Sequence, residues 1–479
     1  MQRRTHRYLR TAGALALAGG SLLAGGAPGA AAAGAAAAGA AASVAIGPMM
    51  SSKFVSASQP PSEDQCVAAF TVPCYQPPQI QTAYDEQPLF NSGITGKGQT
   101  IVLVDSFGSP TIKSDLAIFD AEFGLPAPPS FKIIQPAGKV PAFDPNNSDM
   151  TGWAGETTLD VEWAHTMAPG ANILLVETPV SETEGTHGMP QIVRAENYVI
   201  NHHLGQVISQ SFGATEPTFP SAASIRSLRS AYINANANGV TVLAATGDEG
   251  DTDYSNVAGT LTYTHKAVDW PASDPLVTAV GGTQLALWGN GQRNTPDVAW
   301  NDTTNYALND AFNGSPDPVP SSTGGGLSAV FARPSYQNGV ASVVGNHRGI
   351  PDIAMSGACS GLVVTYDGFG GEQAGWYVDC GTSEATPMFA GIVALADQQA
   401  GHSLGLINPA LYSMLASHAP GIVDVTQGNN TVSFWQDNKL NKVWGYRAGP
   451  GYDLVSGVGT VNAALFVPEL AQAAGGGYQ

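Results

Sequence analysis

Charged residues are scarce in this chain of 479 residues, and positive charge is the scarcer kind. Only 12% of the residues are charged, and 19 Lys and Arg stand against 38 Asp and Glu, which gives a formal net charge of −19. Nucleic-acid binding needs clustered basic residues, so this balance argues against a nucleic-acid partner. Few positive charges would repel one another once the carboxylates are protonated, which suits an acidic medium.

Cysteine is also rare, and the pairs typical of zinc sites are missing. The four cysteines include no Cys-x-x-Cys, and no histidine-rich pair has zinc spacing, which argues against a transition-metal centre. In an exported chain four cysteines suggest two disulfides, for which three connectivities are possible. The local pairings would join Cys66 with Cys74 and Cys359 with Cys380, and the second would brace the segment that leads to Ser383.

Beyond the N-terminal region, no segment is long and apolar enough to span a membrane. The first ten residues are basic, the apolar run TAGALALAGGSLLAGG follows, and alanine-rich sequence comes next. This order is typical of a signal peptide, which we assign to residues 1–42. We therefore expect a secreted, extracellular product that leaves the membrane, with residues 43–74 as an irregular leader and 75–479 as the compact domain.

The compact region alternates apolar strands with helices. Residues 100–104 form a buried strand that ends at Asp105, and a helix that stops at Gly124 follows. A second helix begins near Gly155 and leads to a strand at 171–177, and a further helix is expected over 222–237. Strand, turn and helix in this order predict an α/β fold with a doubly wound, mainly parallel sheet flanked by helices, and they place the functional site at the carboxyl ends of the strands.

Residues 378–399 are the segment around which the rest is organised. A β-compatible approach enters the turn Gly381-Thr382-Ser383, and about four turns of small and apolar residues at helical spacing follow. Ser383 should therefore lie at a helix N-terminus, where unpaired N–H groups and the helix dipole can stabilise a developing anion. By itself such a segment predicts only a capped, buried helix.

Three carboxylates could complete a site with this serine. Glu156 and Asp160 are four residues apart on one helix, so they share a face, and two like charges at that distance raise at least one pKa. Asp248 follows a strand over 240–245 and should lie on the same sheet rim as Ser383. In isolation each feature also fits a solvated acidic face or an ordinary turn.

Together these features resemble the sedolisin family of serine-carboxyl peptidases. The resemblance spans roughly residues 75–466, with motifs in family order. Its carriers are GETTLDVEWAHTMAPGA, SQSFGATE, ATGDEG, WPASDPLVTAVGGT, GGGLSAVFARPSYQ, RGIPDI, CGTSEATPMFAG, DVTQGNN and GPGYDLVSGVGT. It implies a subtilisin-like fold and an acid-acting endopeptidase whose partners are protein or peptide substrates, and we expect a monomer.

The resemblance also assigns roles to residues. It makes Ser383 the nucleophile, Glu156 the general base, Asp160 the residue that orients Glu156, and Asp248 the oxyanion-hole residue. It implies one structural calcium ion, held by Asp424, Val425, Gly449, Gly451 and Asp453. The alternation of glycines and aspartates there can supply the oxygen ligands that calcium prefers, although such spacing also fits turns. Family members commonly carry a large prodomain, for which residues 43–74 are too short.

Two other functions fit parts of the sequence. A conventional subtilisin-like protease would use Asp105, His187 and Ser383, but His187 follows a strand and a polar loop and lacks the small-residue helix expected after such a histidine. Subtilisins also have Asn where Asp248 stands. An exported binding protein on an inactive peptidase scaffold is the other alternative, against which the full set of catalytic residue types argues.

Overall fold

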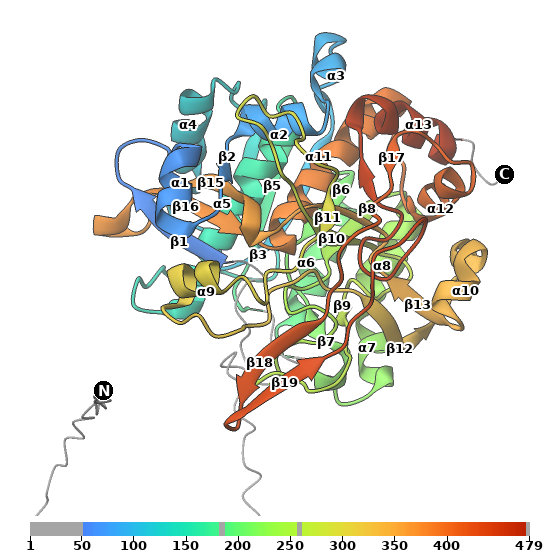
Figure 1. Cartoon of the computed structure of the whole chain (residues 1–479). Coiled ribbons are helices and arrows are strands. Elements are labelled where there is room, and N and C mark those ends of the chain that lie inside the picture. Colours follow the sequence, from blue (N-terminus) through green and yellow to red (C-terminus); the bar gives the residue numbers. More distant parts are fainter. Residues whose placement is uncertain (1–50, 182–186, 256–260, 476–479) are drawn as a thin grey trace, which may run out of the picture. The chain divides into compact units, whose positions relative to one another are not determined.

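An eight-stranded sheet forms the centre of the fold in this computed structural model, which describes residues 51–181, 187–255 and 261–475 (Figure 1). Its strand order is β11-β10-β8-β6-β3-β5-β4, with β14 also paired to β10. All pairs are parallel except β10 with β11. The strands are β3 (Thr100–Ser106), β4 (Phe131–Ile134), β5 (Asn172–Thr178), β6 (Val207–Gln210), β8 (Thr241–Ala245), β10 (Thr278–Gln284), β11 (Val298–Ala299) and β14 (Ile353–Ser356).

Helices cover both faces of this sheet, because its strands are apolar on both sides. Along β3, Ile101 and Leu103 belong to one buried cluster, whereas Val102 and Val104 belong to a second. The first cluster packs under α5 (Ser148–Met167), α11 (Thr382–Ala400), α12 (Asn408–Ala416) and α13 (Ala463–Gly475), and the second under α6 (Met189–Asn201), α7 (Ala222–Leu228) and α8 (Ser230–Asn238). The predicted doubly wound, mainly parallel sheet is confirmed.

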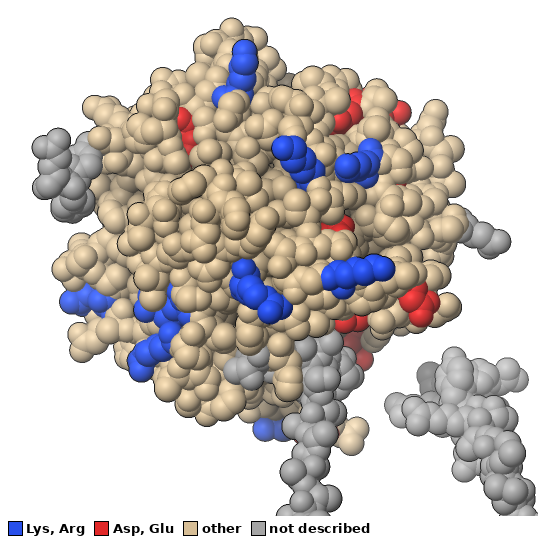
Figure 2. All heavy atoms as spheres, turned by 180° about the vertical axis from the view of Figure 1, so that it is seen from behind, with Lys and Arg blue, Asp and Glu red and all other residues tan. Residues whose placement is uncertain are grey.

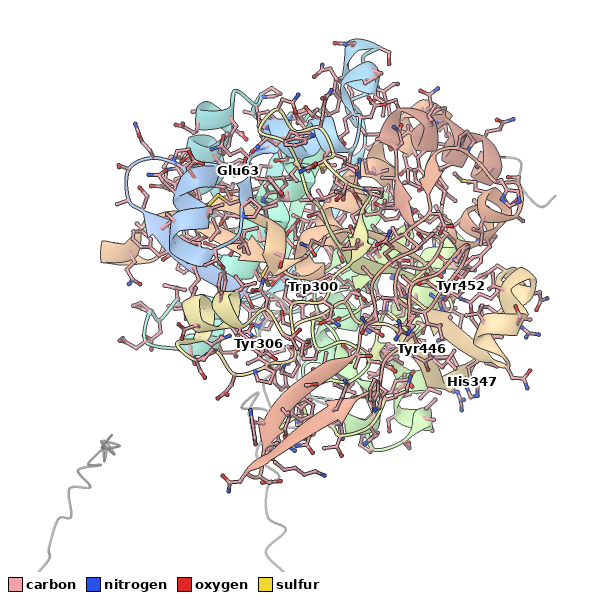
Figure 3. All side chains as sticks on the ribbon, in the orientation of Figure 1. Glu63, Trp300, Tyr306, His347, Tyr446 and Tyr452 are labelled. Atoms are coloured by element: carbon pink, nitrogen blue, oxygen red, sulfur yellow. A yellow bond between two sulfur atoms is a disulfide. The ribbon has the colours of Figure 1, made fainter. Side chains whose placement is uncertain are left out.

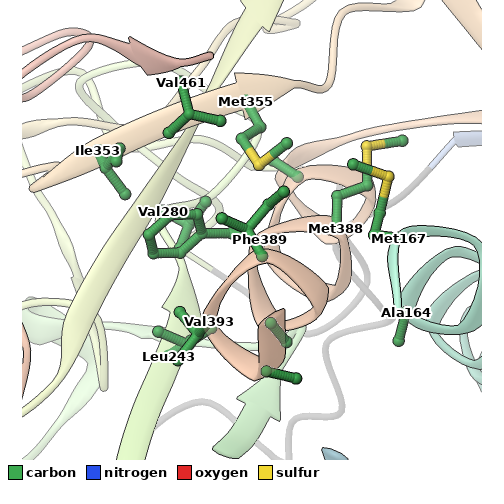
Figure 4. Close-up of a cluster of buried hydrophobic side chains, with 14 of the residues drawn as sticks. Ala164, Met167, Leu243, Val280, Ile353, Met355, Met388, Phe389, Val393 and Val461 are labelled. Carbon is green, nitrogen blue, oxygen red and sulfur yellow. The ribbon is translucent and has the colours of Figure 1, made fainter. Parts of the chain in front are cut away.

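The helices α5 and α11 pack side by side. Figure 4 shows Phe389 of α11 directed at Val280 of the sheet, and Met388 beside Met167 of α5. Close approach depends on Gly391, because a Cβ there would lie 2.4 Å from the Cβ of Met167. This contact brings the two helices that carry the predicted catalytic residues together.

Helix boundaries differ from the sequence prediction in two places. The helix α5 begins at Ser148, before the predicted start near Gly155, because the Asn147 side chain caps it by accepting from the amides of Asp149 and Met150. The first turns of α5 contain glycines, which disfavour helices, so the sequence pattern did not predict this start. The helix expected over 222–237 is divided at Arg229, whose guanidinium binds Asp274.

The prediction of an irregular leader is wrong for its described part. Residues 51–75 contain β1 (Ser51–Ser56), α1 (Glu63–Phe70) and β2 (Cys74–Tyr75). Both strands join a four-stranded sheet of order β1-β16-β15-β2, with β15 (Leu362–Asp367) and β16 (Gly375–Cys380) between them. The backbone of β1 fills the free edge of β16, an interaction between segments more than 300 residues apart that no local pattern reveals. The predicted signal peptide and residues 43–50 lie outside the described residues.

Two disulfides join Cys66 with Cys74 and Cys359 with Cys380, so the local pairing is confirmed. Cys380 ends β16, immediately before the turn that leads to Ser383. The remaining elements are α2 (Pro77–Ala83), α3 (Gln87–Asn91), α4 (Ile112–Phe123), β7 (Ala214–Thr215), β9 (Asp269–Trp270), α9 (Tyr306–Asn313), β12 (Gly326–Ala332), α10 (Ala341–Val344), β13 (His347–Ile350), β17 (Ile422–Val423), β18 (Val432–Gln436), β19 (Lys439–Val443) and β20 (Thr460–Val461). Within the described part of the chain, no helix has the length and hydrophobicity to cross a bilayer.

Candidate active site

Ser383 lies in the first turn of α11, as predicted. Gly381 precedes the helix with φ of 137°, a conformation that suits glycine, and its carbonyl accepts from the Glu384 amide at 3.0 Å. The Ser383 side chain is fully buried. Its hydroxyl donates a long hydrogen bond of 3.4 Å to the Ser211 carbonyl. The serine therefore stands at the positive end of a 19-residue helix.

Glu156 and Asp160 of α5 meet this serine from the neighbouring helix. Both carboxyls are fully buried, and burial raises the pKa of each well above its ordinary value. The charge of Asp160 raises the pKa of Glu156 further, whereas the Ser383 hydroxyl is close enough to lower it. Ser211 donates to Asp160 Oδ1 at 2.7 Å. The structure thus brings together the predicted serine, base and orienting carboxyl.

Asp105 adds a third buried carboxyl to the pair formed by Glu156 and Asp160. It is the next-to-last residue of β3 and is buried, and it lies close enough to Asp160 and Thr157 for their side chains to act on its pKa. Burial, with the charge of Glu177, raises the pKa of Asp105 to about 7. The sequence placed Asp105 only at the end of a strand; its approach to Asp160 depends on how α5 lies against the sheet. An Asp at the carboxyl end of a central strand was the available signal.

Asp248 reaches the serine turn from the other side, on the loop that follows β8. Its Oδ1 accepts from both the amide and the hydroxyl of Thr382, each at 2.8 Å. Burial raises the pKa of Asp248 to about 7, although these two bonds oppose the shift. Because Oδ1 accepts both bonds, a proton on this carboxyl belongs on Oδ2. The group is therefore a potential donor next to Ser383.

The alternative built on His187 finds less support in this geometry. The His187 side chain is exposed two residues before the start of α6, whereas Asp105 and Ser383 are buried. The titratable side chains that shift the pKa of Asp105 are the carboxyls of Glu177 and Asp160. The arrangement agrees with the interpretation of His187 as a loop residue.

A hollow of about 250 Å³ opens beside Asp248. It continues along Glu249, whose carboxylate accepts from the Asp248 amide at 3.0 Å, and Trp300 forms part of its wall. Figure 3 shows Trp300 near the helix α9 that begins at Tyr306. The other residues of the wall are Ser51, Tyr254, Leu308, Asn309, Phe312, Asn313, Val319, Pro320, Ser321 and Cys359. Sequence reasoning missed this wall, since its members come from distant loops.

The predicted calcium ligands converge on one group of loops. The Gly451 amide donates to Asp424 at 2.9 Å, and the Gly449 amide donates to Asp453 at 2.8 Å. The Val425 carbonyl accepts from the Ser456 hydroxyl, which also binds Asp453. Two carboxylates with main-chain carbonyls form an oxygen donor set that fits calcium. Across the described residues, no group of three or more His, Cys, Asp or Glu has metal-binding geometry.

Comparison with known families decides the classification. The family model described as Peptidase S8, subtilase family, matches residues 142–438, which is more than half of the chain. The chain belongs to the subtilase family. The relatives of this chain in the sedolisin group are serine-type peptidases, which are hydrolases.

Individual relatives place the subtilase chain near the sedolisins. It is 34% identical to kumamolisin of Bacillus sp. (strain MN-32) over 397 residues, which cover 81% of this chain and 62% of kumamolisin. It is 29% identical to sedolisin of Pseudomonas sp. (strain 101) over 406 residues, or 84% of this chain and 62% of that protein. The chain thus spans less than two thirds of the length of these relatives.

A solved structure supports the same assignment. Pseudomonas sedolisin, a serine-carboxyl proteinase in complex with pseudo-iodotyrostatin, superposes with a TM-score of 0.65 at 26% identity. The match covers 84% of this subtilase chain and 99% of the other. The resemblance to the sedolisins and the subtilisin-like fold are both confirmed.

Proposed function

We propose that this protein is a secreted serine-carboxyl endopeptidase that cleaves protein or peptide substrates in an acidic medium. The observation that carries the proposal is the burial of Glu156 and Asp160 against Ser383, with Asp248 bound to the adjacent Thr382. A serine hydroxyl needs a base within reach, and a carboxylate serves when its pKa matches the working pH.

In the proposed reaction, Ser383 Oγ attacks the scissile carbonyl carbon while its proton passes to Glu156. Asp160, whose Oδ1 accepts a hydrogen bond from Ser211, orients Glu156 and shares its proton. The oxyanion accepts a hydrogen bond from the protonated Asp248. Glu156 then returns its proton to the leaving amine, and water attacks the acyl-enzyme by the same route in reverse.

The pH dependence of cleavage tests this proposal. Activity on an unstructured protein should be greatest at acidic pH, because Asp248 donates only while it is protonated. The Ser383→Ala variant should lose this activity, and Ser383 in the wild type should react with a covalent serine reagent in acid. A maximum at alkaline pH would contradict the mechanism, and absence of both cleavage and labelling would favour an inactive scaffold that serves as a binding protein.

We also propose one structural calcium ion held by Asp424, Val425, Gly449, Gly451 and Asp453. A bound cation would replace the amide donors that now satisfy the two carboxylates and would tie two C-terminal loops together. Chelation of calcium should therefore lower the melting temperature, and added calcium should restore it. An Asp424→Asn variant should be far less sensitive to chelation. Equal melting temperatures with and without chelator would contradict the site.

A further inference from the structure

The hairpin of β18 and β19 is a preformed element with two different faces. A two-residue turn joins its strands, and Asp437 and Asn438 both adopt positive φ, 54° and 58°, as in the tight turns that match strand twist. On the inner face Val432, Phe434 and Val443 form a small buried cluster. Figure 1 shows the two strands as long red arrows that reach away from the central sheet.

The outer face of this hairpin exposes large apolar side chains. Trp435 and its cross-strand partner Leu440 are 54% and 48% exposed, and Trp444, just after β19, is 67% exposed. The Lys442 ammonium lies 3.8 Å from the centre of the Trp444 ring. We call Trp435, Leu440, Lys442 and Trp444 the hairpin face. Neighbouring large apolar side chains in water are characteristic of binding surfaces, where tryptophan contributes strongly.

One wall of the hollow beside Asp248 is joined to this hairpin. The Gln436 side chain bonds to both the amide and the carbonyl of Thr262, at 2.7 and 3.3 Å. Thr262 pairs with Tyr254, which lines the hollow. The Asp251 amide donates to the Asn430 carbonyl, two residues before β18.

The part of the wall that contains Trp300 is joined to the hairpin as well. The Asn301 side chain donates to the carbonyls of Asn429 and Thr431 at 2.8 and 2.9 Å, and it follows Trp300 of the hollow. Lys266 bonds to Asp251 at 2.8 Å and lies 3.3 Å from the ring centre of Tyr446, which Figure 3 labels near the hairpin base. The hairpin is thus fixed to the loops around Asp248 and extends the site.

We propose that the hairpin face binds the part of a polypeptide substrate that continues beyond the hollow. This inference rests on the proposed peptidase function. An unfolded protein fits the face because it exposes apolar side chains that Trp435, Leu440 and Trp444 can cover. The hydrogen bonds of Gln436 and Asn301 join the hairpin to the loops that line the hollow, so a chain that leaves the hollow on this side meets it. A short peptide that fills only the hollow would not reach it.

Kinetics with long and short substrates test the inference. The double variant Trp435→Ala/Trp444→Ala should raise KM for an unfolded, carboxymethylated protein about tenfold, since loss of two exposed tryptophans removes on the order of 1.4 kcal/mol of binding. Its kcat/KM for a hexapeptide should equal that of the wild type. Trp288→Ala is the matched control, because Trp288 is 58% exposed on the loop between β10 and β11 and lies outside the hairpin face.

A binding measurement separates this inference from the proposed function. Titration of the Ser383→Ala chain with the same unfolded protein should show binding that the two hairpin substitutions weaken and that Trp288→Ala leaves unchanged. Equal losses on protein and hexapeptide, or undiminished protein binding, would overturn the inference. So would sedimentation showing that the substitutions convert a dimer into a monomer, because the face would then join two copies. A wild type that binds but does not cleave would overturn the proposed function alone.

Discussion

At the scale of single residues, Asp248 is the side chain that most distinguishes this site from that of an ordinary serine protease. Its raised pKa, about 7, keeps a proton available through the acidic range and removes it near neutrality, because burial disfavours the charged form. An amide in the same place would donate at every pH. The upper pH limit of activity should therefore depend on this side chain.

Replacing Asp248 by Asn should extend activity to higher pH. The amide oxygen of Asn can accept the two bonds from Thr382, while its NH₂ group takes the place of the protonated oxygen. We expect the decline of kcat/KM on the alkaline side to move upward, with activity in acid kept. Asp248→Ala should lose roughly 100-fold in acid, and this deficit should shrink above neutrality, where the wild type has lost the donating proton as well. An alkaline limb that is the same in wild type and Asp248→Asn would contradict the donor role.

At this scale the sequence predicted which residues would meet, but not all of their contacts. Ser383, Glu156, Asp160 and Asp248 could be placed because helix spacing and strand ends determine which positions share a face or a rim. The contact of Asp105 with Asp160 depends on the angle between α5 and the sheet, which no local pattern encodes. The assigned catalytic and calcium roles stay predictions.

The contact between α5 and α11 controls the site at the scale of elements. Glu156 and Ser383 stand on different helices, so their alignment depends on how closely these helices approach at Gly391. A methyl group added there would meet both Met167 Cβ at 2.4 Å and the Ala164 carbonyl oxygen at 3.3 Å. Neither is the far end of a flexible side chain.

Gly391→Ala should therefore push the two helices apart. We expect a loss of about 1–3 kcal/mol in unfolding free energy, typical of an overpacked core, together with a fall in kcat at unchanged KM. Thermal unfolding and peptide kinetics at acidic pH would measure both. Gly289→Ala is the control, because a Cβ there meets open space. A Gly391→Ala chain that unfolds like the wild type would show that the contact can relax.

Elements were predictable where the pattern is local. The parallel strands are continuous apolar runs, and α11 follows a glycine turn with helical spacing, so both could be recognised from the sequence. The strand β1 could not, because Ser51–Ser56 becomes a strand only by pairing with β16. The early start of α5 was hidden by glycines that the Asn147 cap offsets.

At the scale of the whole molecule, most of the acidic side chains lie in the interior. More than half of the Asp and Glu residues are buried in the described chain. Among the Lys and Arg residues of that part, Arg348 alone is buried. Figure 2 accordingly shows a face with scattered Lys and Arg and few acidic residues. Burial raises the pKa of many of these carboxyls, as for Glu196, where desolvation raises it to about 8.

Stability should therefore fall as the pH rises. In the unfolded chain carboxylates ionise near pH 4, whereas buried carboxyls with raised pKa keep their protons to about pH 7 or 8. Between these values the unfolded chain releases protons first, so stability is greatest below pH 4 and declines toward pH 8. Chemical unfolding at several pH values would measure this decline.

Glu196→Gln isolates one contribution to that decline. The variant should lose less stability than the wild type between pH 4 and pH 8, by on the order of 4 kcal/mol, because about 1.4 kcal/mol accompanies each unit of pKa shift. Glu122→Gln, at an exposed position of α4, should follow the wild type. Parallel curves for Glu196→Gln and wild type would refute this assignment.

The central claim is that a carboxyl, and no imidazole, takes the proton of Ser383. The most direct measurement is kcat/KM on one peptide at acidic pH for Glu156→Gln and His187→Ala, each compared with the wild type. Glu156→Gln should lose at least about 100-fold, since Gln cannot accept the proton, while His187→Ala should retain nearly full activity. A loss in His187→Ala as large as that in Glu156→Gln would contradict the account.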